Sequence, residues 1–543
     1  MKKLYFILLI TSCSLLIVNA QTQFQRAIGG TGLDYAYSIK RTMDGGYAAA
    51  GGTTSLGGGD FYIVKLDAAG SLQWNRTVGG TGYEGAFFIV QTTDSGYAIA
   101  GQTDSFGAGA ADFYIVKLHA AGNLQWNRTI GGANDDVALA IIQSTDGGYA
   151  VAGYTYSFGA GSRDYYIVKL DAGGNLQWNR TIGGTDYDYG ESIIQTTDGG
   201  FAVAGWTQSF GAGSGDFYVV KLDPGGNLQW NRTVGGTDAD YCLSIIQTAD
   251  GGYAMAGQAN SFGAGSNDFY IVKLDAGGSL QWTRTIGGTA LDYAESIIQT
   301  TDGGYAVGGL TYSFGAGNQD MYIVKLDAGG TFQWNRTVGG IGDDYAESLI
   351  QATDGGYVGA GHTNSFGAGD FDVYIVKFDA GGNTCGNTSS PSSLSGTGGT
   401  LGAPTSTVTS PTSTVTTPSP TTATVGTLTT ICFVGIQPIS NEIPKEFKLY
   451  QNYPNPFNPV TRIKFDVTSN VRQPAPNPRG ETSNVKLIIY DLLGREVATL
   501  VNEQLKPGSY EVEWGGANYP SGIYFYKLTV GNFSETKKMV LLK

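Results

Sequence analysis

The stretch from Asp198 to Gly236 reads DGGFAVAGWTQSFGAGSGDFYVVKLDPGGNLQWNRTVGG and is one copy of a unit that fills most of the chain. Its Asp-Gly-Gly turn (Asp-Ser-Gly in one copy) recurs after 50, then 52 residues. A period of this length is typical of propellers and solenoids, and it has to be assigned before any motif is interpreted. The turns begin at Asp44, Asp94, Asp146, Asp198, Asp250, Asp302 and Asp354.

Each unit contains four runs rich in β-branched and aromatic residues. In the unit that contains the quoted stretch and begins shortly before it, these runs cover 192–196, 201–207, 216–222 and 228–234. The Asp-Gly and Gly-Gly pairs between them are hairpin signals, because such turns need residues that tolerate positive φ. Four antiparallel strands repeated around an axis make a propeller blade. We therefore predict an all-β chain built on a β-propeller. A β-solenoid is the alternative, although solenoid coils are usually shorter and lack a hairpin at each junction.

Counting the fourth run gives the number of blades. Its Gln-Trp motif occurs six times, and the seventh unit ends at Cys385 without one. The segment 23–28, QFQRAI, matches 73–78, QWNRTV, with Phe24 in place of Trp74. We therefore predict a seven-bladed propeller over 21–385, closed by the N-terminal strand 23–28. Such a closure removes an exposed strand edge. The Trp74 series itself is expected to pack between blades.

The N-terminus, MKKLYFILLITSCSLLIVNA, has two lysines, an apolar run and a small-residue end. It predicts a signal peptide over 1–20 with cleavage after Ala20, hence a secreted or outer-membrane cell-surface protein. The segment Ile10–Cys13 also resembles a lipoprotein cleavage box, and this alternative stays open. A net charge of −14 argues against a nucleic-acid partner, because phosphate binding needs a basic surface.

Four cysteines are present. Cys13 is expected to leave with the signal peptide, and Cys242 stands alone inside a repeat. Cys385 and Cys432 flank a low-complexity segment, and whether they pair in an oxidising compartment is left open. The segment 386–440 is mostly Ser, Thr, Pro and Gly, so we predict a disordered linker.

After the linker, alternating short strands over 441–543 predict a small β-sandwich. The motifs YPNPFNP, IYDLLGREVATLV, PSGIYFYKL and KKMVLLK follow one another in this region. In these motifs it resembles the C-terminal sorting domain of the type IX (Por) secretion system, and it is similar to the FlgD-type immunoglobulin-like fold. The alternative is an ordinary Ig-like adhesion module. The motif residues are Tyr453, Pro454, Asn455, Pro456, Phe457, Gly494, Gly522, Tyr524, Lys537 and Lys538.

This resemblance implies a partner, the secretion machinery, and export across an outer membrane. It also implies removal of the tail, with release or attachment to surface lipopolysaccharide. The pattern over 23–383 resembles secreted bacterial propellers, which implies the fold and no activity.

Two sets of residues are candidates for a site on the face where each blade joins the next. The first is a set of acids, Asp34 to Asp344, each ten residues before an Asp-Gly-Gly turn, with the Asp60 series beside it. These acids could form a Ca²⁺ site, which takes six to eight oxygens, or they cap turns. We favour turn capping and expect no cofactor. The second set varies between near-identical units and comprises Tyr154, Tyr156, Trp206, Gln258, Tyr312 and His362.

Aromatic faces and amide groups in the second set suit stacking on sugars or peptides. We find no GxSxG, HExxH, CxxCH or phosphate-binding loop. The sequence therefore predicts a non-enzymatic binding module for a glycan, peptide or protein. Alternatives are an extracellular carbohydrate-active hydrolase or lyase that uses Asp or Glu on the same face, and a structural surface spacer.

Overall fold

The Gly-rich turns divide the chain into short strands, and the described residues contain no helix. The computed structural model describes residues 23–55, 58–385, 444–468, 483–516 and 519–542, with the backbone of short strands between 388 and 440. No described segment forms a helix long and apolar enough to cross a membrane. The chain separates into one compact unit ending at Val434 and a second from Gly435 to Lys543. The signal peptide predicted over 1–20 lies outside the described residues.

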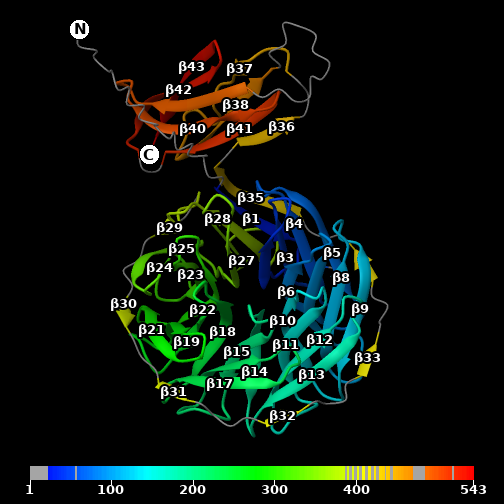
Figure 1. The fold of residues 1–543 in the computed structure, drawn as a ribbon. Coiled ribbons are helices and arrows are strands. Elements are labelled where there is room, and N and C mark those ends of the chain that lie inside the picture. The colour runs from blue at the N-terminus through cyan, green and yellow to red at the C-terminus, as the bar shows by residue number, and fades with distance from the viewer. Residues whose placement is uncertain are drawn as a thin grey trace, which may run out of the picture. The chain divides into compact units, whose positions relative to one another are not determined.

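The first unit is a ring of seven sheets, each made of four strands of the repeat and one further strand (Figure 1). The innermost strands are β2 (Ser38–Arg41), β6 (Glu84–Gln91), β10 (Asp136–Gln143), β14 (Asp188–Gln195), β18 (Asp240–Gln247), β22 (Asp292–Gln299) and β26 (Ser348–Gln351). The second strands are β3 (Tyr47–Thr53), β7 (Tyr97–Thr103), β11 (Tyr149–Thr155), β15 (Phe201–Thr207), β19 (Tyr253–Ala259), β23 (Tyr305–Thr311) and β27 (Tyr357–Thr363).

The third strands are β4 (Asp60–Leu66), β8 (Asp112–Leu118), β12 (Asp164–Leu170), β16 (Asp216–Leu222), β20 (Asp268–Leu274), β24 (Asp320–Leu326) and β28 (Asp372–Phe378). The fourth strands are β5 (Leu72–Gly79), β9 (Leu124–Gly131), β13 (Leu176–Gly183), β17 (Leu228–Gly235), β21 (Leu280–Gly287), β25 (Phe332–Val338) and β1 (Gln23–Gly29). The fold is thus a seven-bladed β-propeller.

The N-terminal strand β1 is the fourth strand of the last blade. It pairs antiparallel with β28, from Phe24 opposite Lys377 to Ile28 opposite Val373. Phe24 and Ile28 are fully buried, and Phe24 contacts Tyr47 of the first blade at a ring-centroid distance of 6.1 Å. In the other blades the corresponding Trp packs on the first aromatic residue of the next second strand, as Trp74 does on Tyr97. The same interblade contact therefore closes the ring.

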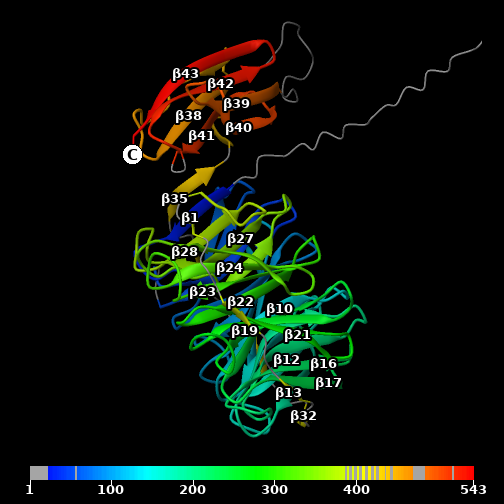
Figure 2. The ribbon, with the colours of Figure 1, turned by 90° about the vertical axis from the view of Figure 1, so that its left-hand side faces the viewer.

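Within the segment predicted to be a disordered linker, seven short strands lie between 388 and 434, and we call them the belt. They pair with the outer edge of each blade in reverse chain order, and both views show β35 beside β1 (Figure 2). The belt consists of β29 (Thr388–Ser389), β30 (Leu394–Gly396), β31 (Thr400–Gly402), β32 (Thr407–Thr409), β33 (Thr414–Thr416), β34 (Thr421–Ala423) and β35 (Thr427–Val434).

The pairing of these strands has a physical reason. Composition alone says that the segment cannot bury a core, but each fourth strand offers a row of unpaired backbone groups. Short Thr- and Val-rich pieces such as Thr-Val-Thr at 407–409 and 414–416 favour extended backbone and pair with those groups. The belt therefore covers an edge on every blade.

The core of the ring lies between neighbouring blades. Apolar residues of one blade's second and third strands interleave with those of the next, as Phe217 and Val219 do with Tyr253 and Met255. The third strands are completely buried, which explains their continuous apolar runs. Each blade therefore depends on both of its neighbours.

The second unit is a sandwich of two four-stranded sheets around one apolar core. One sheet contains β36 (Ile436–Ser440), β41 (Gly508–Gly515), β38 (Val460–Val467) and β37 (Lys448–Leu449). The other contains β40 (Glu496–Leu505), β39 (Ser483–Tyr490), β42 (Gly522–Val530) and β43 (Phe533–Leu541). The immunoglobulin-like character of this sandwich stays a prediction.

Candidate functional site

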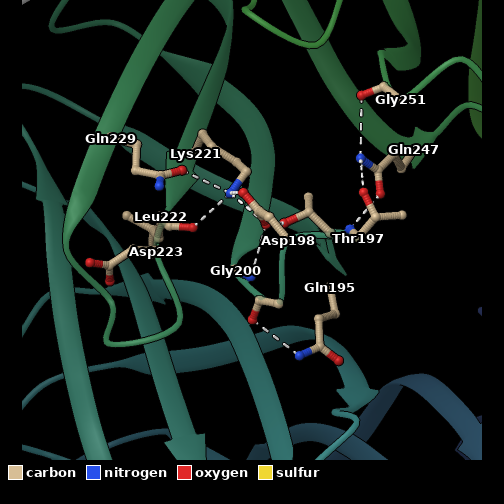
Figure 3. Close-up of polar contacts among 12 residues, drawn as sticks. Gln195, Thr197, Asp198, Gly200, Lys221, Leu222, Asp223, Gln229, Gln247 and Gly251 are labelled. Atoms are coloured by element: carbon tan, nitrogen blue, oxygen red, sulfur yellow. Dashed lines mark hydrogen bonds and ion pairs between the residues drawn. The ribbon is translucent and has the colours of Figure 1, made fainter.

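The residues that recur in every blade are used by the scaffold. In the blade of β14 to β17, Lys221 is buried, and its Nζ donates to Asp198 Oδ2 at 2.8 Å, to the Leu222 carbonyl and to Gln229 (Figure 3). Asp198 also accepts from the Gly200 N–H within the turn. The Asp-Gly-Gly turn is thereby fastened to the third strand in all seven blades.

The acids on the opposite face form buried pairs at the blade junctions. Asp164 and Asp188 meet at Gly183, where a Cβ atom would collide with the Asp164 carboxylate. Asp164 Oδ2 accepts from the Ala160 N–H at 2.9 Å, and Asp188 Oδ2 accepts from the Ser209 hydroxyl at 2.7 Å. The same pairing occurs for Asp372/Asp34, Asp60/Glu84, Asp112/Asp136, Asp216/Asp240, Asp268/Asp292 and Asp320/Asp344.

Burial raises the pKa of Asp164 to about 6, and the neighbouring Asp188 adds to the effect. These acids hold loops through backbone N–H groups, which is the capping role favoured above. Among the described residues, no three His, Cys, Asp or Glu side chains gather in a way that could hold a metal ion. Ca²⁺ binding stays a prediction.

Three of the six variable residues come together on this face. Tyr154 of β11 and Tyr156 just after it lie at 4.7 and 4.2 Å from the guanidinium carbon of Arg163, measured to the ring centroids. Tyr187 and Tyr189 of the next blade approach the same guanidinium at 5.6 and 4.7 Å. We call these four tyrosines and Arg163 the tyrosine cage. A guanidinium is attracted to ring faces, so Arg163 holds the rings in place.

Trp206 of β15 extends the cage toward the next blade. Its ring stacks on Tyr189 at 4.1 Å with an interplanar angle of 16°, and Tyr241 lies 4.6 Å away on its other side. A hollow of about 450 Å³ lies next to Tyr154 and is lined by Gln102, Asp104 and Asp135 among others. Three consecutive blades thus present rings beside carboxylate and amide groups.

The other three variable residues lie elsewhere. Gln258 of β19 is half-buried, and Tyr312, in the loop after β23, is 41% exposed and contacts Tyr293 edge-on. His362 of β27 is buried at the seam, where it stacks on Tyr345 at 4.1 Å. Sequence analysis did not predict that Arg163, Tyr187, Tyr189 and Tyr241 belong to this site. Arg163 could have been found, because its counterparts in the other units are Gly59, Ala111, Gly215, Asn267, Gln319 and Phe371.

A second group of residues missed by the sequence lines the axis of the ring. A cavity of about 360 Å³ is bounded by the innermost strands of all blades, and we call it the channel. One residue from each blade faces it at equivalent positions: Tyr37, Phe87, Leu139, Glu191, Leu243, Glu295 and Glu347. In five blades this residue is the bulged one, which has no opposite partner in the ladder with the second strand. A bulge re-aims a side chain, here toward the axis.

Burial raises the pKa values of the carboxyl groups in the channel. The pKa of Glu191 is raised to about 7, and that of Glu347 is also raised to about 7. The pKa of Glu295 is raised well above its ordinary value by burial and then by the charges of Glu347 and Glu191. Trp206 Nε1 donates to Glu191 Oε1 at 3.2 Å, which connects the channel to the tyrosine cage.

The cysteines divide as follows. Cys242 is free and buried, and burial raises its pKa far above the ordinary range, so it is an inert core residue. Cys385 is disulfide-bonded. Cys432 lies opposite Gln25 in the belt register, and the Gln25 side chain donates to the Cys385 carbonyl. Pairing of Cys385 with Cys432 stays a prediction.

Residues of the sorting motifs help to build the sandwich of the second unit. Phe457 is buried against Trp514 at 5.5 Å and donates its backbone N–H to the Val540 carbonyl, whereas Tyr453 is 80% exposed. Asn455, in the same motif, accepts from the Val540 N–H. The remaining motif residues lie in the same loop (Pro454, Pro456), at a positive-φ turn (Gly494), on β42 (Gly522, Tyr524) and on β43 (Lys537, Lys538).

Comparison with known proteins identifies this second unit. Residues 451–542 match the family model described as "Secretion system C-terminal sorting domain". The chain is also 28% identical over 190 residues to the regulatory protein FlaEY of Caulobacter vibrioides, which covers 32% of this chain and a fifth of that relative's length.

Among solved structures, the chain is similar to Sqt1 from Chaetomium thermophilum, with a TM-score of 0.37 and 12% identity over 62% of this chain and 83% of that one. It is also similar to an endo-1,5-α-L-arabinanase from Thermotoga petrophila, with a TM-score of 0.27 and 12% identity over 66% of this chain and all of that one. Likenesses this distant carry no statement about activity.

Proposed function

Because the chain ends in a sorting domain, which indicates export by a type IX secretion system, we propose that its propeller works outside the cell as a binding module. The ligand that we expect first is a glycan. A peptide or protein segment is the alternative ligand, which the test below distinguishes. The binding surface is the tyrosine cage together with Trp206, Tyr241 and the adjoining hollow.

A single observation carries this proposal. In a propeller whose scaffold repeats almost unchanged, aromatic rings from two neighbouring blades surround one arginine, and Trp206 and Tyr241 extend this group to a third blade. Stacked rings that keep partial exposure offer apolar faces to sugar C–H groups or to peptide side chains. Gln102, Asp104 and Asp135 in the adjoining hollow provide acceptors for hydroxyl groups. By contrast, the repeated acids are buried in pairs and already accept backbone N–H groups, which favours binding over hydrolysis.

Binding is tested with the full-length protein on a glycan array and a peptide array. The Tyr154→Ala, Trp206→Ala double variant should lose at least tenfold in affinity for any hit. Tyr156→Ala, which removes a ring at the outer side of the cage, should lose a smaller factor. Phe332→Ala is the matched control, because Phe332 is 38% exposed on an outer strand of another blade. Unchanged binding in a folded double variant would rule out this surface. Turnover of a polysaccharide, abolished by one Asp→Asn change, would instead indicate the hydrolase or lyase.

Attachment to the outer membrane and removal of the tail belong to the same proposal. A periplasmic reporter fused to Phe447–Lys543 should reach the medium or the cell surface in a host with a type IX system. The same fusion with Phe457→Ala should stay inside, because Phe457 anchors the YPNPFNP segment in the sandwich core. Retention of the unaltered fusion in the periplasm would contradict the export role.

A further inference from the structure

The channel has features that the scaffold does not explain. Seven equivalent positions face it, and four carry apolar or aromatic residues (Tyr37, Phe87, Leu139 and Leu243). The other three are Glu191, Glu295 and Glu347, which come from three different blades and share one cavity of about 360 Å³. Carboxylates placed among apolar walls are destabilised by the loss of water. A structural role would be served better by Leu, as at Leu139 and Leu243.

A second observation points to a missing partner. His362 is 93% buried, with 7% of its surface exposed, and its Nδ1 has no hydrogen-bond partner. This nitrogen faces Glu347 Oε1 at 3.8 Å, too far for a direct hydrogen bond. Burial lowers the pKa of His362 to about 3, so the imidazole is neutral and does not neutralise Glu347. A buried polar atom of this kind normally has a partner.

We propose that the channel binds a ligand through an alkylammonium group held by Glu295 and Glu347, with Glu191 adding negative charge to the same cavity. An ammonium group has three donors and no acceptor, so it can donate to two carboxylates and to the free Nδ1 of His362 at once. Its alkyl chain would lie along Phe87, Leu139 and Leu243. A diamine, a lysine side chain or an amino sugar carries this group.

The geometry favours an organic cation over a metal ion. Metal ligands must converge at about 2.0–2.6 Å on one point, and the described residues hold no such group of three acids or histidines. Glu295 and Glu347 come from adjacent blades, Leu243 separates Glu295 from Glu191, and apolar or aromatic residues occupy the other equivalent positions. Such spacing suits a ligand with an apolar body.

Charge balance supports the same class of ligand. Among the described residues that line the channel, Lys40 is the one basic residue, and its Nζ lies 4.3 Å from the ring centroid of Phe88. Burial lowers its pKa to about 8, so it offsets one negative charge at most. Tyr37 also lines the channel, and burial raises its pKa, whereas His362 lies beside Glu347 and is neutral. Bound cations would therefore replace protons on Glu191 and Glu347, and affinity should rise from pH 6 to pH 8.

The site lies below the tyrosine cage and shares only the Trp206–Glu191 hydrogen bond with it. It therefore goes beyond the proposed binding face, and either can fail without the other.

The test is isothermal titration of the full-length protein with 1,5-diaminopentane at pH 7.5 and physiological salt. The neutral analogue 1,5-pentanediol has nearly the same size and shape. We expect the diamine to bind with release of protons, measured as a heat that varies with the ionisation enthalpy of the buffer. The diol should bind at least tenfold more weakly. The Glu295→Gln, Glu347→Gln double variant should also weaken diamine binding at least tenfold.

Glu446→Gln is the charge-matched control, since Glu446 is exposed in the second unit, and it should bind as the parent does. Circular dichroism and the melting temperature verify that each variant folds. The proposal is overturned if the diamine does not bind, if the diol binds equally well, or if the double variant binds unchanged. It is also overturned if Ca²⁺ or Mn²⁺ binds and the double variant removes that binding while the diamine has no effect.

Discussion

The two kinds of aspartate in each repeat should respond in opposite ways to the same substitution. Asp164 is 1% exposed at a blade junction beside Asp188, and burial raises its pKa from 3.8 to about 6. Asp198, in the turn, accepts from the buried Lys221 at 2.8 Å, and its pKa is lowered to about 2. For Asp198, burial alone would raise the pKa, and the hydrogen bonds from Lys221, Thr196 and Gly200 outweigh it.

The sign for Asp164 follows from proton binding. Between about pH 4 and pH 6 the folded state holds more protons at this group than the unfolded state, so stability falls as pH rises through that window. Above it, ionised Asp164 destabilises the fold by about 3 kcal/mol at most, since one pKa unit corresponds to about 1.4 kcal/mol. Asn carries no charge there. Its oxygen can accept from the Ala160 and Gly161 N–H groups as Asp164 does, and its amide can donate toward Asp188.

We therefore expect Asp164→Asn to stabilise the propeller by about 1–3 kcal/mol at pH 8 and to have almost no effect at pH 4. Asp198→Asn should destabilise it at pH 8 by about 1–2 kcal/mol, a value reduced because the Asp198 side chain is 54% exposed. The stabilisation of the fold by ionised Asp198 is fully present above about pH 4 and is lost as the pH falls toward 2.

The assay is differential scanning calorimetry of the full chain at pH 4, 6 and 8, following the propeller transition. For a ring of this size, 1 kcal/mol corresponds to a shift in melting temperature of about 1 °C or slightly more. Asp164→Asn should therefore melt about 1–3 °C above the parent at pH 8, and Asp198→Asn about 1–2 °C below it. If Asp164→Asn lowers the melting temperature at pH 8 as Asp198→Asn does, the buried acid pair is not destabilising and the reasoning is refuted.

Three further predictions concern the ring itself. Phe24→Ala should lower stability by about 3–5 kcal/mol because Phe24 is fully buried at the seam. Phe332→Ala, at a site 38% exposed, should lower it by under about 1 kcal/mol. Equal effects of the two substitutions in chemical unfolding would contradict the closure of the ring by β1. A chain ending at Val434 keeps the belt and should melt higher and aggregate less than one ending at Cys385, which leaves seven outer edges unpaired. Similar melting and light scattering of the two would argue against the belt. Gly205→Ala should disrupt its blade because the new Cβ would overlap the Tyr189 carbonyl oxygen. Gly199→Ala lies at a turn where a new Cβ meets no clash but φ is +83°, so it should lower stability by only about 1 kcal/mol in the same unfolding assay.

Much of the candidate site could not be read from the repeat, and particular residues show why. Tyr154, Tyr156 and Trp206 were identifiable because they break the repeat at one strand position. Their partners Tyr187 and Tyr189 belong to the next blade, and their proximity depends on how two sheets pack. Glu191, Glu295 and Glu347 also break the repeat, yet only the bulge in the innermost strand turns Glu191 and Glu295 toward the axis.

The raised pKa values of the junction acids depend on the same packing. Asp164 and Asp188 are 24 positions apart in the chain, and only the docking of two blades brings both carboxylates to Gly183. Sequence reasoning assigned these acids to turn capping, which their hydrogen bonds support, but it had no access to their burial.

The sequence by itself determined the all-β class, the seven blades, the place of the seam at Phe24 and the sorting domain at the C-terminus. Each of these depends on local features: a fixed period, turn residues that tolerate positive φ, a missing fourth strand, and ordered motifs. Only the tertiary structure decided that 388–434 forms a belt, that four tyrosines surround Arg163, and that three glutamates share one channel. Those arrangements depend on strand edges, burial and neighbours that exist only after the ring has closed, so no local pattern encodes them.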